Sequence, residues 1–336
     1  MRSGIENWLL SHWYGNRRPP WYLRMLVPLY RAAYQRRQKR GQTFHSSVPL
    51  IVVGNITAGG TGKTPLVIRL CEIAIEMNLK AGIASTGYGR QSRDTLLVEA
   101  DSDTRTCGDE PVLLALRTGV PVVVASKRRE AVHRLNEMKL DLIISDDGLQ
   151  QADLHRDIEF CVVDGQRGIG NAYLIPAGPL RESPARLRQV DHVVTNGHWN
   201  ARPDDVDVSE MHLMASVVRS IDGVTQYEVE EFRQKHTGTR LHAVAGIGNP
   251  ARFFNMLEGM GFDLELNGFP DHHYYTHRDF DSLASGSAII MTEKDAVKCR
   301  SLKLQNAWYV PVETHLSAEF EDMFKQQLAK LMKQRS

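Results

Sequence analysis

Between residues 50 and 195, short apolar runs alternate with segments whose apolar positions have helical spacing. The runs cover residues 50–53, 82–85, 121–125, 141–145, 159–163 and 191–195. Strand and helix patterns that alternate in this way are typical of a parallel sheet with helices on both faces. The pattern therefore predicts an α/β fold with a mostly parallel sheet.

The pattern changes after residue 198, where polar residues dominate as far as 210. A second strand–loop–helix pattern begins at residues 241–245, and an amphipathic helix starts near Ser317. We expect an N-terminal arm over 1–41, a larger α/β domain over 42–210, an extended linker or hairpin over 211–230, and a smaller α/β domain over 231–336.

Composition is that of an ordinary folded domain, since 42% of the 336 residues are hydrophobic and 24% are charged. The four cysteines are scattered and form no Cys-x-x-Cys pair. A disulfide scaffold and a zinc ribbon are therefore not expected. The simplest interpretation is a reducing compartment with buried thiols.

Charge is distributed unevenly along the chain. Residues 1–41 hold nine Lys or Arg and one acid, Glu6, so the arm carries +8; the remainder, with 32 bases and 39 acids, carries −7. The arm also holds three of the five tryptophans. Aromatic rings beside arginines suit a membrane interface, so we expect an amphipathic helical arm that docks on a membrane surface. The alternative is a basic helix packed on the body, with its tryptophans in the core.

A glycine-rich loop follows the first apolar run and precedes a helical pattern. It reads Gly54-Asn-Ile-Thr-Ala-Gly-Gly-Thr-Gly-Lys-Thr-Pro65. A strand, a glycine loop ending in Gly-Lys-Thr and a helix are the context of a P-loop, which makes 42–210 a nucleotide-binding domain of P-loop NTPase type. We expect the loop to cradle phosphates through Thr57, Ala58, Gly59, Gly60, Thr61, Gly62, Lys63 and Thr64. Lys63 would reach the terminal phosphates and the Thr64 hydroxyl would bind Mg²⁺, although Thr57 replaces the usual first glycine.

Two adjacent acids, Asp146 and Asp147, end the apolar run at 141–145. One carboxylate after a buried strand commonly holds the Mg²⁺ of a bound nucleotide, whereas adjacent acids alone more often mark a turn. Partition-type ATPases also combine glycine loops with membrane targeting, but they carry a lysine where this chain has Ala58. That class is therefore less favoured.

Further motifs make the chain resemble the tetraacyldisaccharide 4′-kinase family, which phosphorylates a lipid A precursor. In the order of the family, they are Gly87-Tyr-Gly-Arg90, Gly108-Asp-Glu-Pro111, Asp146-Asp-Gly-Leu-Gln150, Arg156-Asp157, Asp164-Gly165, Gly170-Asn171, Pro176-Ala-Gly-Pro-Leu-Arg-Glu182, Phe269-Pro-Asp-His-His273 and Thr292-Glu-Lys-Asp295. The family's loop commonly lacks the first glycine as well. One departure is Gln151, where the family often has histidine.

The resemblance implies transfer of the ATP γ-phosphate to the 4′-hydroxyl of a tetraacyl glucosamine disaccharide 1-phosphate. It implies ATP and Mg²⁺ as cofactors and this lipid as the partner. It also implies peripheral docking through residues 1–41 on the cytoplasmic face of the Gram-negative inner membrane. Nucleic acid is not expected as a partner, because the body is net acidic.

The resemblance also implies roles for individual residues. Asp109 is the expected base for the sugar hydroxyl, with His272 as its partner and Asp271 beside it. Glu182 joins Asp146 and Asp147 near the metal, and which of the two aspartates binds it directly stays open. Without the resemblance, Asp109 reads as an acid at a helix N-terminus, where acids are common.

Two further charged segments have open roles. Lys127-Arg128-Arg129 follows a strand, so it either faces a ligand in the crevice or begins a solvated helix. Glu293-Lys294-Asp295 is expected to be structural, in an interdomain ion pair. Two other functions remain as alternatives: a membrane-bound ATPase switch without a small-molecule acceptor, and a P-loop kinase for a soluble metabolite.

Overall fold

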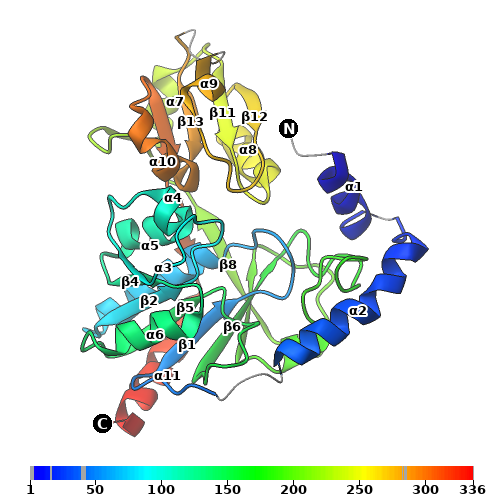
Figure 1. Ribbon diagram of the computed structural model, residues 1–336. Helices are drawn as coiled ribbons and strands as arrows, with labels where there is room; N and C mark the ends of the chain where they lie inside the picture. Colours follow the sequence, from blue (N-terminus) through cyan, green and yellow to red (C-terminus); the bar gives the residue numbers. More distant parts are fainter. Residues whose placement is uncertain (1–3, 16, 39–42, 282, 284–285, 336) are drawn as a thin grey trace.

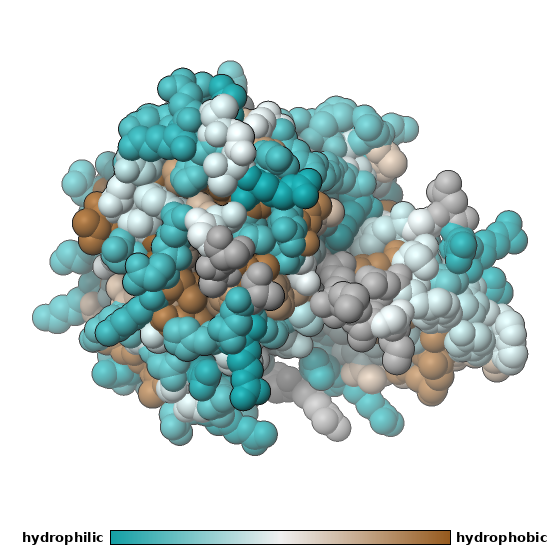
Figure 2. All heavy atoms as spheres, turned by 90° about the horizontal axis from the view of Figure 1, so that it is seen from above, coloured by the Kyte–Doolittle hydropathy of each residue, from teal (hydrophilic) through white to brown (hydrophobic). Residues whose placement is uncertain are grey.

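The computed structural model describes residues 4–15, 17–38, 43–281, 283 and 286–335. Figure 1 shows two sheet-containing units, one above the other, with the N-terminal arm beside the larger, lower unit. Figure 2, seen from above, shows a mainly hydrophilic surface on which hydrophobic residues form small groups. The predicted P-loop-type α/β fold with a smaller second α/β unit is confirmed.

The larger sheet has nine strands, and all neighbouring strands from β8 to β4 run parallel. The two edge strands, β15 and β3, are antiparallel to their neighbours. In spatial order the strands are β15 (Glu313–His315), β8 (Val208–Met214), β7 (His192–Asn196), β6 (Ile158–Asp164), β1 (Leu50–Gly54), β5 (Leu142–Asp146), β2 (Ala81–Ser85), β4 (Val122–Val124) and β3 (Leu96–Val98).

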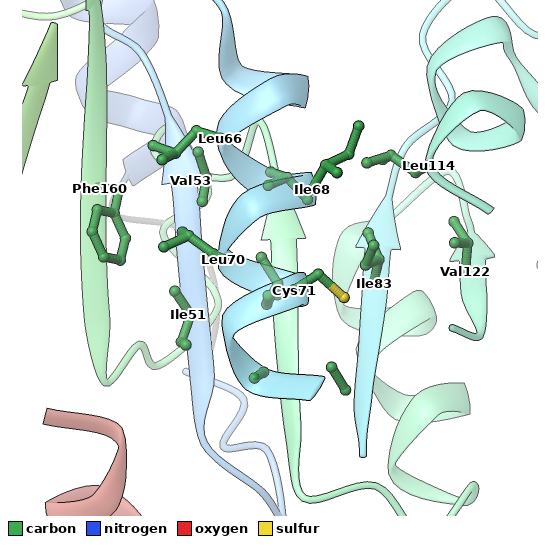
Figure 3. Close-up of a cluster of buried hydrophobic side chains, with 14 of the residues drawn as sticks. Ile51, Val53, Leu66, Ile68, Leu70, Cys71, Ile83, Leu114, Val122 and Phe160 are labelled. Carbon is green, nitrogen blue, oxygen red and sulfur yellow. The ribbon is translucent and has the colours of Figure 1, made fainter. Parts of the chain in front are cut away.

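Strand β1 is buried on both sides, which explains its unbroken apolar run. Ile51 and Val53 face α3 (Lys63–Glu76), where Figure 3 shows Val53 beside Leu66 and Ile51 nearer to Leu70. The alternate β1 residues join the core on the opposite face, together with α6 (Arg128–Asn136). Helices on both faces leave the carboxyl edge of the sheet as the place for a ligand.

The smaller unit contains a six-stranded sheet whose strands β14, β13, β11 and β12 are parallel. Strands β9 and β10 form the hairpin predicted within 211–230 and pair antiparallel at one edge. The order is β10 (Gln226–Glu228), β9 (Val217–Ser220), β14 (Ala307–Val310), β13 (Ile289–Thr292), β11 (Leu241–Ala245) and β12 (Leu264–Gly268). Its helices are α7 (Val229–Lys235), α8 (Pro250–Gly259), α9 (His277–Asp281) and α10 (Glu293–Cys299).

The end of the chain differs from the predicted division, which placed all of 231–336 in the second domain. After β14 the chain returns to the larger sheet as β15, and α11 (Ala318–Arg335) packs on the α3 face of that sheet. Phe324 of α11 contacts Phe160 of β6, with their ring centroids 5.5 Å apart. The amphipathic pattern predicted a buried face on this helix but did not specify its partner. At the other boundary, β8 carries the larger sheet past residue 210.

Replacing Phe324 with alanine is expected to lower the free energy of unfolding by about 3–5 kcal/mol, because its ring is fully buried in the larger core. Chemical denaturation measures the change. The control is Lys330→Ala on the exposed side of the same helix, for which a change within about 0.5 kcal/mol is expected. Equal stabilities of the two variants would contradict this packing.

The arm consists of α1 (Gly4–Trp13) and α2 (Trp21–Gln38), as predicted for a helical arm; residues 1–3, 16 and 39–41 of it lie outside the described residues. Tyr30 Oη donates a hydrogen bond to the Arg181 carbonyl, 3.0 Å away, and ties α2 to the larger unit. No side chain of α2 is fully buried. Within the described part of the chain, no helix is both long and apolar enough to cross a membrane.

Candidate active site

The glycine loop lies between β1 and α3, at the carboxyl edge of the larger sheet. Gly59 and Gly62 have φ angles of 104° and 98°, a left-handed conformation that glycine adopts without strain. The Asn55 side-chain amide, 3.3 Å from both the Gly59 carbonyl and Thr61 Oγ1, holds the loop from inside. The loop is therefore pre-shaped, with its backbone N–H groups and the helix N-terminus available to an anion.

A cleft of about 610 Å³ lies between the two units, with the loop on one side. Of the predicted site residues, Ala58 to Thr64, Asp147, Asp271 and His272 line the cleft. Apolar residues of both units line it too, namely Ile68, Leu113, Leu213, Ile247, Phe253, Met256, Val310 and Val312. The cleft thus combines a phosphate-type loop with an apolar region.

Four predicted site residues lie behind this lining: Thr57, Asp109, Asp146 and Glu182 are all buried. Thr57 is buried, forms an isolated backbone bridge with Leu180 and is not among the residues that line the cleft. Its φ is not positive, so this position does not require glycine.

Of the two adjacent aspartates, Asp147 is the one whose carboxylate faces Lys63. Its carboxylate lies 3.5 Å from Lys63 Nζ and 3.2 Å from Arg181 Nη1. Burial would raise the pKa of Asp147, but Lys63, Arg181 and Arg128 outweigh it and hold the pKa well below its usual range. Asp147 therefore remains ionised at any physiological pH.

Asp146, the last residue of β5, is in the opposite electrostatic situation. Its Oδ1 is buried and accepts no hydrogen bond. Burial, followed by the negative charge of Glu110, raises the pKa of Asp146 to about 7 despite the opposing effect of Lys63. An unpartnered buried carboxylate oxygen next to a phosphate loop fits a hard cation such as Mg²⁺, which takes one or two carboxylates in addition to substrate phosphates.

Glu182 has other partners. Gln150 Nε2 donates to its Oε1 at 2.7 Å, and Arg186 Nε lies 3.5 Å from Oε2. Gln150 also donates to the Asn55 carbonyl, so Glu182 is linked to the start of the glycine loop. Among the described residues, no group of three or more His, Cys, Asp or Glu is arranged to hold a metal by itself.

Asp109 and His272 contact each other at the wall of the cleft, although 163 positions separate them in the chain; His272 lines the cleft and Asp109 lies behind it. Asp109 is the first residue of α5 (Asp109–Thr118), and His272 lies between β12 and α9 with a φ of 58°. His272 Nδ1 is 3.1 Å from both carboxylate oxygens of Asp109. Asp271 accepts a hydrogen bond from the His272 backbone N–H at 3.0 Å and fixes this turn.

The two groups stabilise each other's charged forms. Burial alone would raise the pKa of Asp109, but Lys294, His272 and Lys298 hold the pKa well below its usual range. For His272, burial would lower the pKa, but the hydrogen bond to Asp109 outweighs it and the pKa is raised. The Tyr88 ring lies beside the imidazole, with its centroid 5.1 Å away. This pair can accept a proton from a hydroxyl in the cleft.

Other charged residues singled out from the sequence have different positions. Arg128 is buried and donates to the Asp146 carbonyl at 2.6 Å, whereas Lys127 is exposed beside Glu130. Arg128 therefore supports the end of β5, Lys127 and Arg129 are exposed, and none of the three lines the cleft. Gln151, which replaces the usual histidine, donates to Asp153 at 2.8 Å.

The expected interdomain ion pairs of the Glu293–Asp295 segment are confirmed for two residues. Arg117 of α5 lies 2.7 Å from Glu293, and Lys294 lies 3.0 Å from Glu110. Asp295 instead stays within its own unit, where it accepts from the Gly246 N–H at 3.0 Å.

Two cleft residues were missed by the sequence analysis. Arg252 of α8 donates to the Asn196 carbonyl at 3.1 Å, and Asn196 Nδ2 donates to the Thr61 carbonyl at 3.2 Å. This links the second unit to the glycine loop. No motif marks Arg252, whereas Asn196 could have been found from its position at the carboxyl end of a predicted strand.

Comparisons with known proteins show the family to which the chain belongs. A model of the family described as "Tetraacyldisaccharide-1-P 4'-kinase" matches residues 19–329. The tetraacyldisaccharide 4'-kinase of Methylobacillus flagellatus is 42% identical over 99% of both chains, and that of Shewanella sp. strain W3-18-1 is 46% identical over 84% of this chain and 81% of its own. The crystal structure of "apo" form LpxK from Aquifex aeolicus in complex with ATP has a TM-score of 0.72 and 25% identity, covering 92% of this chain and 95% of its own. The chain belongs to the tetraacyldisaccharide-1-P 4'-kinase family.

Proposed function

We propose that this protein transfers the γ-phosphate of ATP to the 4′-hydroxyl of a tetraacyl glucosamine disaccharide 1-phosphate, yielding the 4′-phosphorylated lipid A precursor. One observation carries the proposal: a phosphate-type loop and His272 line the same cleft, and His272 is hydrogen-bonded to the Asp109 carboxylate just behind that lining. Phosphoryl transfer to a hydroxyl needs an anion cradle and a proton acceptor facing each other. Family membership supplies the substrate class.

The nucleotide binds with its phosphates on residues 58–64. The loop N–H groups and Lys63 bind the β- and γ-phosphates, and the apolar side chains around Phe253 and Val310 cover the base. Thr64 and Asp146 would hold Mg²⁺, since Asp146 has the unpartnered oxygen, while Asp147 orients Lys63 and Glu182 orients Gln150. When bound, Mg²⁺ neutralises charge that develops on the phosphates.

The acceptor hydroxyl is placed at the Asp109–His272 pair. The 4′-oxygen forms a bond to the γ-phosphorus while the bond from that phosphorus to the β,γ-bridging oxygen breaks, releasing ADP. The hydroxyl proton passes to Asp109 and is shared with His272, whose ring stays hydrogen-bonded to the carboxylate. Asp271 holds His272 in the turn that faces Asp109.

The first experiment follows labelled γ-phosphate from ATP into the tetraacyl disaccharide 1-phosphate in detergent micelles. We expect labelled lipid from the wild-type protein and a near-total loss with Lys63→Ala. ATP consumption without labelled lipid would overturn the proposal in favour of a membrane-bound ATPase switch. Labelling of a soluble sugar but not of the lipid would indicate a kinase for a soluble metabolite.

We infer that α2 docks peripherally on the cytoplasmic face of the inner membrane. Trp21, Met25 and Leu29 lie one helical turn apart and are 69%, 66% and 67% exposed, so they form an apolar stripe without a protein partner in the described chain. Arginines on the same helix suit anionic headgroups. Trp21 on α2 is thus not a core residue, whereas Trp13 on α1 is half-buried and donates a hydrogen bond to the Pro176 carbonyl at 3.0 Å. The packed-helix alternative therefore describes α1 but not α2.

Replacing Trp21, Met25 and Leu29 together by serine is expected to weaken binding to anionic phospholipid vesicles at least about tenfold, because three apolar side chains no longer leave water on docking. Cosedimentation with vesicles measures binding, and activity on micellar substrate is measured in parallel. Val224→Ser is the control, since Val224 is an even more exposed apolar residue, at 83%, but lies on the second unit. Unchanged vesicle binding by the triple variant would place docking elsewhere.

A further inference from the structure

Helix α10 of the second unit directs two lysines at Asp109 of the first. Lys294 and Lys298 are one turn apart, and their Nζ atoms lie 3.7 and 3.9 Å from Asp109 Oδ2. Both lysine side chains are buried or nearly so, with 16% and 3% exposed. A carboxylate that pairs with His272 on one side therefore faces two ammonium groups on the other.

The two lysines have different surroundings. Lys298 is held within its own unit by Asp295, 2.8 Å away, and lies 5.0 Å from the centre of the Tyr275 ring. Lys294 instead contacts three carboxylates: Glu110 at 3.0 Å, Asp271 at 3.6 Å and Asp109 at 3.7 Å. Of the two, Lys294 is thus the one that touches both the Asp109 helix and the turn carrying His272.

We propose that Lys294 is a positioning residue for phosphoryl transfer, which fixes Asp109 against His272 and keeps the carboxylate free to accept the hydroxyl proton. The inference rests on the proposed role of the Asp109–His272 pair. A single ammonium between α5 and the 271–272 turn sets their separation directly, since it binds acids on both. Displacement of a reacting group by about 1 Å can lower a rate about 100-fold.

Electrostatics add a second consequence. The charged groups facing Asp109 are His272 and Asp271 of the turn, Lys294 and Lys298 of α10, and Glu110 of its own helix. Lys294 lowers the pKa of Asp109 because it favours the anion, and it lowers the pKa of His272 because it disfavours the cation. Removing Lys294 raises both pKa values, so the acid limb of the activity profile moves to higher pH.

The test is Lys294→Met, which keeps an unbranched side chain, shorter by one atom, and removes its charge. We expect kcat to fall about 10- to 100-fold, with KM for ATP little changed, because the lysine acts on the acceptor side. The acid limb of kcat/KM for the lipid should move up by about one pH unit or more. Lys294→Arg should return the acid limb to its wild-type position and recover part of kcat.

Arg117→Met is the matched control. It removes the ion pair with Glu293, which joins the same two helices at 2.7 Å but touches neither Asp109 nor His272. We expect its pH profile to match that of the wild type. Thermal unfolding of each variant checks that the fold persists, and the charge-preserving arginine variant keeps the test valid if the methionine variant unfolds.

Three results would overturn the inference. The first is a Lys294→Met enzyme with wild-type kcat and pH profile. The second is a loss confined to KM for ATP, which would make Lys294 a nucleotide ligand. The third is an equal shift of the acid limb in Arg117→Met, which would mean that Lys294 acts only by holding the two units together. Failure of the proposed function looks different, because then the wild-type protein labels no lipid or Asp109→Asn keeps full kcat.

Discussion

Replacing Asp109 with asparagine is expected to lower kcat by about 100- to 10,000-fold, the range in which a positioned acid–base group contributes. The amide keeps the shape of the side chain but cannot take the hydroxyl proton. Asp109 lies behind the cleft lining and does not touch the glycine loop directly, so ATP affinity should stay near that of the wild type. Transfer of labelled phosphate to the lipid gives kcat, and calorimetric titration with ATP gives affinity.

Asp279→Asn is a matched control for this variant. Asp279 pairs with His273, the neighbour of His272, at 3.3 Å, and this second histidine–aspartate pair lies outside the cleft lining. Its kcat is expected to remain near the wild-type value. If Asp109→Asn instead lost ATP binding while kcat at saturating ATP stayed high, Asp109 would be a nucleotide-site residue and not the base.

Much of the larger unit could be predicted from local patterns, for a physical reason. Strands buried on both faces are mostly apolar, as β1 is throughout and β5 is up to Ile144, so their runs are visible without any knowledge of the fold. The antiparallel edge strands gave no such signal, because β3 is only three residues long and β15 (Glu-Thr-His) is polar. The return of α11 to the first core was also hidden, since an amphipathic face indicates burial but not the surface that covers it.

In the site, too, the sequence identified the residues, but their arrangement depends on contacts between distant parts of the chain. The order of motifs identified Asp109 and His272, and the structure brings them within 3.1 Å. Adjacent acids could not be ranked from the sequence, because the difference between them lies in the turn. Asp147 has a φ of 52°, which directs its carboxylate to Lys63, while Asp146 stays buried at the end of β5.

Replacing Lys63 with alanine is expected to lower kcat/KM for ATP about 100- to 1,000-fold or more, because a preorganised cation is removed from the position where the transferring phosphoryl group carries charge. Unlike Asp109→Asn, this change should also weaken ATP binding. Asp147 would lose its 3.5 Å contact with Lys63 and keep only Arg181, 3.2 Å away, as an ion-pair partner. Labelled-phosphate transfer and ATP titration together separate the two variants.

Lys127→Ala provides the control for Lys63, since Lys127 is an exposed lysine at the same edge of the sheet that pairs with Glu130 and does not line the cleft. Its kinetic constants should match those of the wild type. A comparable loss in both variants would mean that the general positive charge of this edge attracts the nucleotide. If only Lys63→Ala loses kcat/KM, the reaction needs an ammonium at the position of Lys63, beside the loop N–H groups and Asp147. Positive charge elsewhere on this surface then does not replace it.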